Sequence, residues 1–436
     1  MNILESMTGA SPETRLFLLK FFNYYGENLV SMNASMLSKD LLMPKKSVAT
    51  ALQYLVEEGY ITRIINQDKY VSGLDLDMRG VKETVSRYRF QLKPLAFKWC
   101  NKLVEATGIE PKFKVIFYKL SQGDGRLKTL LAIALMISMN STGYILGQVE
   151  KLKQMTGFSD AQLEGEAKAL VNVGFLSIVK GVSRSELLST LRTIYHVNIA
   201  WLEFPRLYIG TDLRESEITY SRFFEFNDMY HGNLYSSSKI LKSFPGFEFF
   251  EDITKSLSLK NVQYIFAVKE WGFSELMLRY LSTGSFAFMD VYDDCVNFFK
   301  HHLPPSADFG SDSNDKSEKY SRLYESLIKT LSEELASKLD VYYESFKFLP
   351  KSYKKSILSI DLVLKKRMVV MLDDKNNTSL VSSSLFSMRT NHGVSLKDVL
   401  INSEAILSVN SKVSFVDDSK VESLKIVDVK REESIL

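Results

Sequence analysis

Six polar side chains in the N-terminal part of the chain are of the types that bind nucleic acid. Lysine binds a phosphate as a point charge, and hydroxyl and amide groups pair with base edges in a major groove. They follow Pro44 on the outer side of a predicted helix and are Lys45, Lys46, Ser47, Thr50, Gln53 and Tyr54. This pattern indicates a surface that contacts double-stranded DNA.

Enzyme signatures are missing from the sequence. It contains no P-loop, no GxGxxG, no GxSxG and no HExxH pattern. The nearest approach to a metal-binding group is Asp293, Asp294, Cys295, His301 and His302. Histidines at the end of a helix are already favoured by the helix dipole, so they need no metal to explain them. We therefore expect no enzyme, no cofactor and no metal site.

The size and the charge of the chain limit the number of its domains and the kinds of partner it can bind. The chain has 436 residues, enough for two to four domains of about 100–200 residues each. Hydrophobic residues make up 45% and charged residues 25%, as in globular proteins. The formal net charge of +3 gives no overall attraction to nucleic acid. Residues 1–130, however, hold 19 Lys and Arg against 13 Asp and Glu, so the excess positive charge lies near the polar run.

The compartment is predicted from cysteines and apolar segments. Two cysteines, Cys100 and Cys295, make no disulfide framework and suit a reducing cytoplasm. The N-terminus has no basic stretch followed by an apolar run, so no signal peptide is expected. The most apolar stretch, Leu127 to Met139, is shorter than the roughly 20 residues that cross a bilayer. A cytoplasmic protein without membrane contact is expected.

The polar run belongs to a pattern of two helices and a strand between Asn33 and Ile61. Pro44 suits the start of the second helix, because proline has no N–H to lose there. Gly59 is expected to end that helix, and β-prone residues follow it. Apolar residues three and four apart predict its buried face, made of Val48, Ala49, Leu52, Leu55 and Val56.

The order helix, turn, basic helix and strand resembles the winged helix-turn-helix family of DNA-binding domains. The resemblance covers Arg15 to Gly73, with a first helix from Glu13 to Tyr25. One departure is Met43, which stands where Ser, Thr or Asp commonly caps the recognition helix.

The resemblance also implies a wing, a hairpin from Tyr60 to Ser72 with Asn66-Gln67-Asp68 at its tip. Arg63 and Lys69 flank this tip and are expected to contact the DNA backbone or the minor groove.

Two segments flank this unit. Met1 to Pro12 is expected to be a short mobile arm. Asp75 to Thr107 is expected to be largely helical, with Pro94 breaking or kinking the helix. Its basic residues form either a solvated face or a further surface for the DNA backbone.

A second copy of the plan is predicted over residues 125–200. The segment LVEEGYITRI of the first unit corresponds to LVNVGFLSIV here. The expected elements are helices at Leu127–Met139, Leu146–Thr156 and Asp160–Val173, strands at Phe175–Val179 and Thr193–Ile199, and an inserted helix at Ser183–Leu191.

The third helix of the second copy has an acidic outer face, formed by Asp160, Gln162, Glu164, Glu166 and Lys168. The phosphates of a duplex carry a dense negative charge and should repel this face. We therefore expect this copy to be a structural or dimerising module rather than a second domain that contacts bases.

The rest of the chain is expected to be rich in helices. Residues 201–305 are rich in Phe and Tyr, which more often form a core than a platform for single strands. The helices expected there are Asp252–Ser258, Lys260–Glu270, Ser274–Ser282 and Ala287–His302. A polar linker over 304–317 follows, then a long helix from Lys316 to Phe346, a strand at Val363–Leu372 and a short helix at Ser395–Leu400.

Leucines three or four apart run along the long helix. They pack either within one chain, which the pattern favours, or in a coiled-coil seam between two copies of the chain. A dimer has two surfaces available, this helix and the second winged helix, and we favour the helix, with Leu327 and Leu331 in its seam.

The predicted fold class is mainly α with small β wings, with tandem winged helices before an α-rich C-terminal region. The predicted domains are residues 1–75 (winged helix), 76–124 (helical linker), 125–200 (second winged helix), 201–305 (aromatic-rich helices) and 306–436 (long helix, small α+β region and tail).

Three functions fit these expectations. The first is a sequence-specific DNA-binding protein, most simply a bacterial transcriptional regulator acting as a homodimer. The second is a plasmid or mobile-element replication initiator, a family that this chain distantly resembles in joining two winged helices. The third is a structural subunit of a nucleoprotein complex. A protein partner for the C-terminal half fits any of them.

Overall fold

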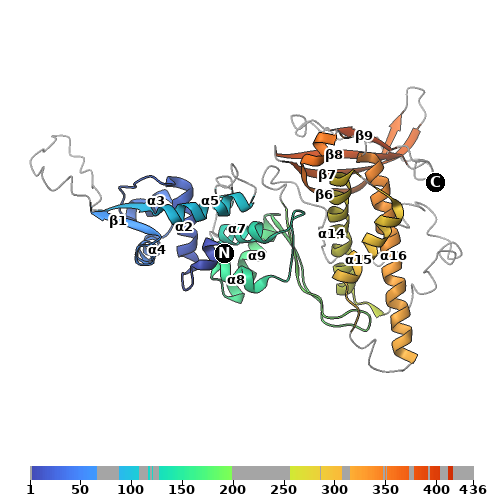
Figure 1. The fold of residues 1–436 in the computed structure, drawn as a ribbon, viewed down its shortest axis with the longest axis horizontal. Coiled ribbons are helices and arrows are strands. Elements are labelled where there is room, and N and C mark those ends of the chain that lie inside the picture. The colour runs from blue at the N-terminus through green and yellow to red at the C-terminus, as the bar shows by residue number, and fades with distance from the viewer. Residues whose placement is uncertain are drawn as a thin grey trace, which may run out of the picture. The chain divides into compact units, whose positions relative to one another are not determined.

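The computed structural model describes residues 2–65, 88–107, 116, 117, 120, 127–198, 256–284, 286–306, 315–346, 349, 351–372, 378–390, 393–402 and 411–415. The chain divides into two compact units (Figure 1). The first comprises residues 1–138 and 148–173, and the second comprises residues 139–147 and 174–436. The described part is mainly helical with antiparallel sheets, which confirms the predicted class at that level.

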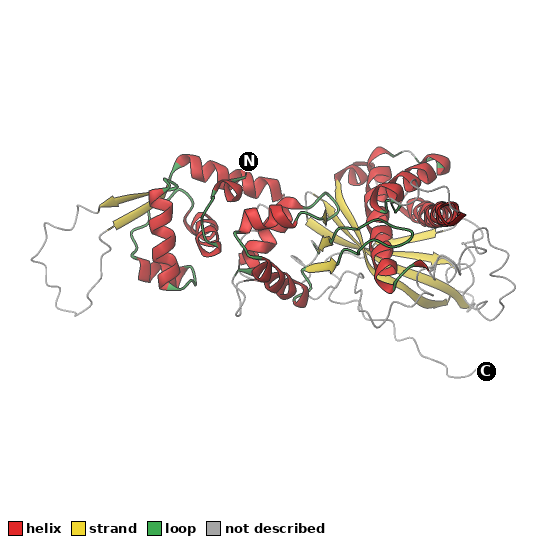
Figure 2. Ribbon diagram, turned by 90° about the horizontal axis from the view of Figure 1, so that it is seen from below, coloured by secondary structure: helices red, strands yellow, loops and turns green. Residues whose placement is uncertain are grey.

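The first unit is built of helices with one two-stranded ribbon (Figure 2). Its helices are α1 (Ile3–Ser6), α2 (Pro12–Tyr25), α3 (Ala34–Asp40), α4 (Lys45–Glu57), α5 (Pro94–Thr107), α7 (Lys128–Ser138), α8 (Val149–Thr156) and α9 (Asp160–Asn172), and its strands are β1 (Ile61–Ile65) and β2 (Tyr88–Leu92). These bounds confirm the predicted helices around residues 13–25, 34–40 and 44–58.

The N-terminal arm is ordered, so the expectation of a mobile segment was wrong. Asn2 and Glu5 form a capping box on α1, and Ile3 and Leu4 are buried. The arm is held by the guanidinium of Arg15, which is only 4% exposed. This group donates to five backbone carbonyls, those of Leu4, Met7, Ala10, Gln154 and Met155. It therefore joins the arm and α2 to the last turn of α8.

The strand β2 corrects the predicted helical linker. Residues 88–92 pair antiparallel with β1, from Ile61 opposite Leu92 to Ile65 opposite Tyr88. The helix expected at residues 88–92 is therefore wrong, because these residues pair with β1 instead. Pro94 does not break a helix but begins α5, where its missing N–H costs nothing. The predicted wing tip at 66–68 and the return strand to Ser72 lie outside the described residues.

The three helices α7, α8 and α9 confirm the helices predicted for the second copy, although Tyr144–Leu146 precedes α8 as strand β3. Ser159 caps α9 in a capping box with Gln162. Gly157 and Gly174, both with positive φ, follow the ends of α8 and α9.

The second unit contains the strands β3, β4 (Leu176–Val179) and β5 (Ile194–Val197) in the order β3-β5-β4. The helix predicted at Ser183–Leu191 was wrong. This segment is non-helical, and Leu187 and Leu188 are fully buried in the core of the second unit. Leu188 also forms a bridge with Pro305, so the connection between β4 and β5 is part of that core.

Three long helices form the centre of the second unit: α14 (Leu259–Thr283), α15 (Phe288–His302) and α16 (Asp315–Phe346). The sequence predicted a break near Gly272, but α14 is continuous. A Cβ at Gly272 would lie 2.9 Å from Phe298 and 3.0 Å from Leu335. The glycine therefore permits close packing of α14 on α15 and α16. Most of the aromatic-rich region, residues 199–255, lies outside the described residues.

The leucine seam of α16 is used within the chain. Leu327 and Leu331 are 1% and 0% exposed and belong to the core of the second unit, in which α16 packs on α14 and α15. The exposed side of α16 is charged instead, with Glu318 paired to Arg322 and Lys329 to Glu333. Packing within the chain, the alternative that the pattern favoured, is therefore confirmed, and the choice of this helix as the dimer surface was wrong.

A four-stranded antiparallel sheet completes the second unit. After the short helix α17 (Lys351–Ser356), its strands are β6 (Ile357–Leu372), β7 (Thr378–Thr390), β8 (Gly393–Asn402) and β9 (Ser411–Phe415) in sequential order. The strand predicted at 363–372 is confirmed within β6, but the short helix predicted at 395–400 is part of β8. Among the described helices, none has the length and apolar content for crossing a membrane.

The buried seam gives a first prediction. Replacing Leu327 and Leu331 by Asp should unfold the second unit, because two charges would enter a packed core at a cost of more than about 4 kcal/mol. Circular dichroism and limited proteolysis of the full chain would measure the loss. Glu318→Ala with Lys329→Ala on the exposed side is the matched control and should leave the fold intact. A folded second unit in the Asp variant would contradict the assignment.

Candidate nucleic-acid interface

The turn between α3 and α4 sets the direction of the candidate DNA-contacting helix. The N–H of Met43 donates to the Ser38 carbonyl at 2.9 Å and that of Leu42 to Lys39 at 3.4 Å. This pair of bonds is a Schellman motif, in which the residue after the C-cap takes a left-handed conformation. Leu42 occupies that position with φ +51, where glycine is usual, and its side chain is 58% exposed.

A buried lysine of α2 also stabilises this turn. Lys20 of α2 is 3% exposed and its ammonium donates to the Leu41 carbonyl at 2.8 Å. A cation there is favoured by the negative end of α3. The hydroxyl of Ser38 donates to the Met43 carbonyl at 2.6 Å. The orientation of α4 is thus determined by polar contacts to backbone oxygens as well as by apolar packing.

The structure separates the predicted contact residues of α4 into two groups. Lys45, Lys46, Thr50 and Gln53 are exposed, whereas Ser47 and Tyr54 are half-buried. The buried face is confirmed for Val48, Leu52 and Leu55 but not for Ala49, which is exposed; Ala51 takes the buried place. Residues three and four apart form the outward face: Lys46, Ala49, Thr50, Gln53 and Glu57.

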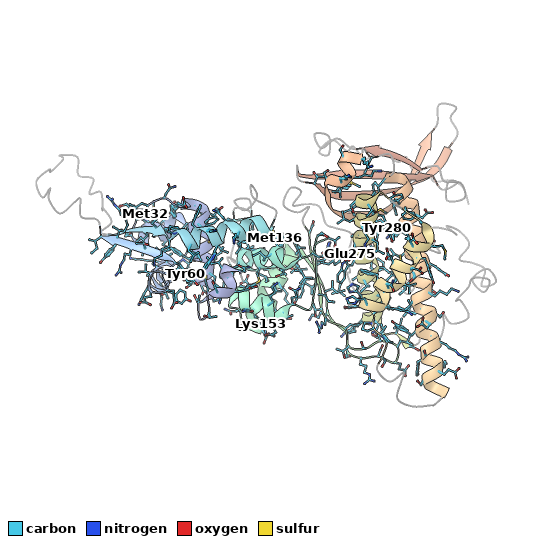
Figure 3. The ribbon with its side chains drawn as sticks, viewed as in Figure 1. Met32, Tyr60, Met136, Lys153, Glu275 and Tyr280 are labelled. Carbon is cyan, nitrogen blue, oxygen red and sulfur yellow. The ribbon has the colours of Figure 1, made fainter. Side chains whose placement is uncertain are left out.

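Tyr54 lies at the edge of this face and holds the N-terminal arm. Its hydroxyl donates to the Thr8 carbonyl at 3.0 Å. Burial, with Glu58 nearby, raises the pKa of Tyr54, so the phenol remains a neutral donor. Next along the chain, the hydroxyl of Tyr60 (labelled in Figure 3) lies 3.4 Å from that of Ser6. The arm therefore packs beside α4 through these two tyrosines.

The N-terminal end of α4 carries positive charge without a neutralising cap. Pro44 is the N-cap residue, one position later than predicted, and no side chain bonds the first N–H groups of the helix. Lys45 and Lys46 lie at the first two helical positions and are exposed. The unsatisfied N–H groups, the helix dipole and two ammonium groups together favour an anion such as phosphate.

Further along the same face, Gln53 is held by a neighbour that the sequence analysis did not single out. Its Nε2 donates to Oε1 of Glu57 at 3.0 Å, one helical turn away. Both side chains are exposed. The spacing of four residues between them was the signal that could have identified Glu57.

The ribbon beside α4 supplies one more predicted residue. Arg63 of β1 is exposed, and its guanidinium carbon lies 5.1 Å from the centre of the Tyr88 ring on β2. This cation–π contact leaves the charge at the surface while limiting the side chain's freedom. Lys69 lies outside the described residues.

The lysines of α8 and α9, the helices predicted for the second copy, differ from those of α4 because they are paired with carboxylates. Lys153 (labelled in Figure 3) pairs with Glu150 and Asp160, each at 2.8 Å, and Lys168 pairs with Glu164 at 3.3 Å. The two cations are therefore neutralised locally.

The turn before α9 packs against the N-terminal arm. A Cβ at Gly157 would lie 3.1 Å from the Ala10 carbonyl and 3.2 Å from Nε of Arg15. The glycine therefore allows the turn to approach the arm closely.

The acidic and histidine residues near the end of α15 have separate partners. Asp294 accepts hydrogen bonds from Tyr280 and from Arg279, the latter at 3.0 Å. His302 packs on Trp271, with ring centres 4.1 Å apart, and burial lowers its pKa to about 4. Within the described residues, no group of three or more His, Cys, Asp and Glu could hold a metal ion.

Comparison of the chain with models of protein families and with curated proteins finds no match. The functional argument therefore rests on the geometry of α4 and its surroundings.

The left-handed leucine gives a second prediction. Leu42→Gly should stabilise the first unit by about 0.5–1 kcal/mol, because glycine takes a positive φ without the clash of a Cβ and little burial is lost. Lys39→Gly, inside α3 where φ is helical, is the control and should destabilise by about 1 kcal/mol. Thermal denaturation of both variants measures the difference. A destabilised Leu42→Gly variant would show that the leucine side chain stabilises the turn.

Proposed function

We propose that the protein binds double-stranded DNA sequence-specifically, most simply as a bacterial transcriptional regulator, with α4 lying in the major groove. The observation that carries the proposal is the exposed face of α4, which begins with two lysines at an uncapped helix end and continues with Thr50 and Gln53. Lysines at the helix start suit phosphates, and hydroxyl and amide groups suit base edges. The protein acts by binding rather than by catalysis.

We also propose that α2, α3, α4, β1 and β2 form a winged helix and that α7, α8 and α9 are the helices of a second winged-helix module. The order of the elements and the hydrogen-bonded turn between α3 and α4 support the first assignment. We propose that Arg63 and Lys69 contact the DNA backbone or minor groove as wing residues, and the exposed guanidinium of Arg63 beside Tyr88 supports this for Arg63.

The second module is proposed to be structural. Its acidic helix carries Asp160 and Glu164 at the surface, and the turn before that helix packs against the N-terminal arm. Negative charge on a reading helix would be repelled by phosphate. This asymmetry favours a regulator over a replication initiator, because both winged helices of an initiator contact DNA.

With one DNA-contacting helix per chain, we propose a homodimer. Its two-fold symmetry would provide a second such helix for a second half-site of the DNA. The core position of Leu327 and Leu331 removes the long helix as the dimer surface. An inverted repeat upstream of the gene would support the regulator, whereas an array of direct repeats would support an initiator. Either role places the protein in the cytoplasm.

The direct test is a third prediction. Lys45→Ala with Lys46→Ala should weaken binding to every duplex and flatten the slope of log affinity against log salt by about 1.8, because two phosphate contacts release fewer counterions. Gel-shift titrations at several salt concentrations, with a duplex selected from a random library, measure both effects.

The matched control is Lys151→Ala with Lys168→Ala, which removes two exposed lysines from the second module. It should leave both affinity and slope unchanged. If the Lys45 and Lys46 variant binds like the wild type, α4 is not the DNA-contacting helix.

A further inference from the structure

The hydrogen bond between Gln53 and Glu57 bears on which base pair the outward face of α4 can read. A glutamine amide has one oxygen that accepts and two N–H groups that donate. The bond to Glu57 uses one N–H and leaves the oxygen and the second N–H available. Those two groups are the ones that pair with N6 and N7 of adenine in the major groove.

The carboxylate also determines the direction of the amide. Turning the amide by half a turn would place its oxygen against Oε1 of Glu57, and two acceptors repel each other. The nitrogen therefore faces the C-terminal end of α4 and the oxygen faces away from it. Guanine presents two acceptors, N7 and O6, so an amide held in this direction would set oxygen against oxygen.

We propose that Glu57 is a positioning residue that holds Gln53 for adenine, so that the DNA site contains an A·T pair opposite Gln53 and excludes G·C there. This inference rests on the proposed function. It also explains an acidic residue on a face that meets DNA. Glu57 lies towards the C-terminal end of α4, away from the lysines at the other end.

The neighbouring Glu58 provides a matched control. It is exposed and carries the same charge, and it is the C-cap residue of α4. The carboxylate bonded to Gln53 belongs to Glu57. Removing either charge should raise affinity for all duplexes similarly, whereas only the loss of the Glu57 carboxylate should change the preference between base pairs.

The experiment uses the full chain and a site selected from a random duplex library. Competition binding then compares the selected duplex with one in which the A·T pair is replaced by G·C. The wild type should prefer A·T by about tenfold, and Gln53→Ala should lose this preference. Glu57→Ala should reduce it by about twofold, the typical contribution of a pair four residues apart. Glu57→Gln, which keeps an acceptor, and Glu58→Ala should retain it.

Three results would overturn the inference alone. The first is a base preference that is as strong in Glu57→Ala as in the wild type, and the second is an equal reduction of the preference in Glu58→Ala. The third is selection of guanine at the position sensitive to Gln53→Ala. A selection that retains no duplex would overturn the proposed function and this inference with it.

Discussion

The first unit depends on one buried cation. The guanidinium of Arg15 satisfies carbonyl oxygens of the N-terminal arm and of the last turn of α8, and burial lowers its pKa. Each hydrogen bond to a charged group contributes about 1.5–3 kcal/mol, and a buried charge without such partners is costly. The arm in turn meets Tyr54 of α4, so the same contact network reaches the candidate interface. The N-terminal end of α4 remains exposed and carries two lysines.

Local signals in the sequence were sufficient for the elements of the candidate site. Pro44 and Gly59 marked the ends of α4, because helix-starting prolines and left-handed glycines act within a few residues. The polar residues of α4 were therefore assigned to the right helix, and four of the six lie exposed.

Features that depend on distant partners could not be predicted. Residues 88–92 have helical spacing, yet pairing with β1 makes them a strand. Gly272 resembled a break, but α15 and α16 approach it too closely for any side chain. The leucines of α16 fitted both a core and a coiled-coil seam, and only the packing of α14 and α15 decided between them. At the site, the exposure of Ala49 depended on the rotation of α4 against its neighbours, whereas the bond between Gln53 and Glu57 is local to the helix and could have been predicted from their spacing.

The central claim is that DNA meets α4 and not α9. Acetylation of lysines in the full chain, with and without a selected duplex and read by mass spectrometry, tests it directly because each helix set has exposed lysines. We expect the duplex to protect Lys45 and Lys46 while Lys151 and Lys168 stay fully reactive. Protection of Lys151 and Lys168 with unchanged reactivity at Lys45 and Lys46 would contradict the account.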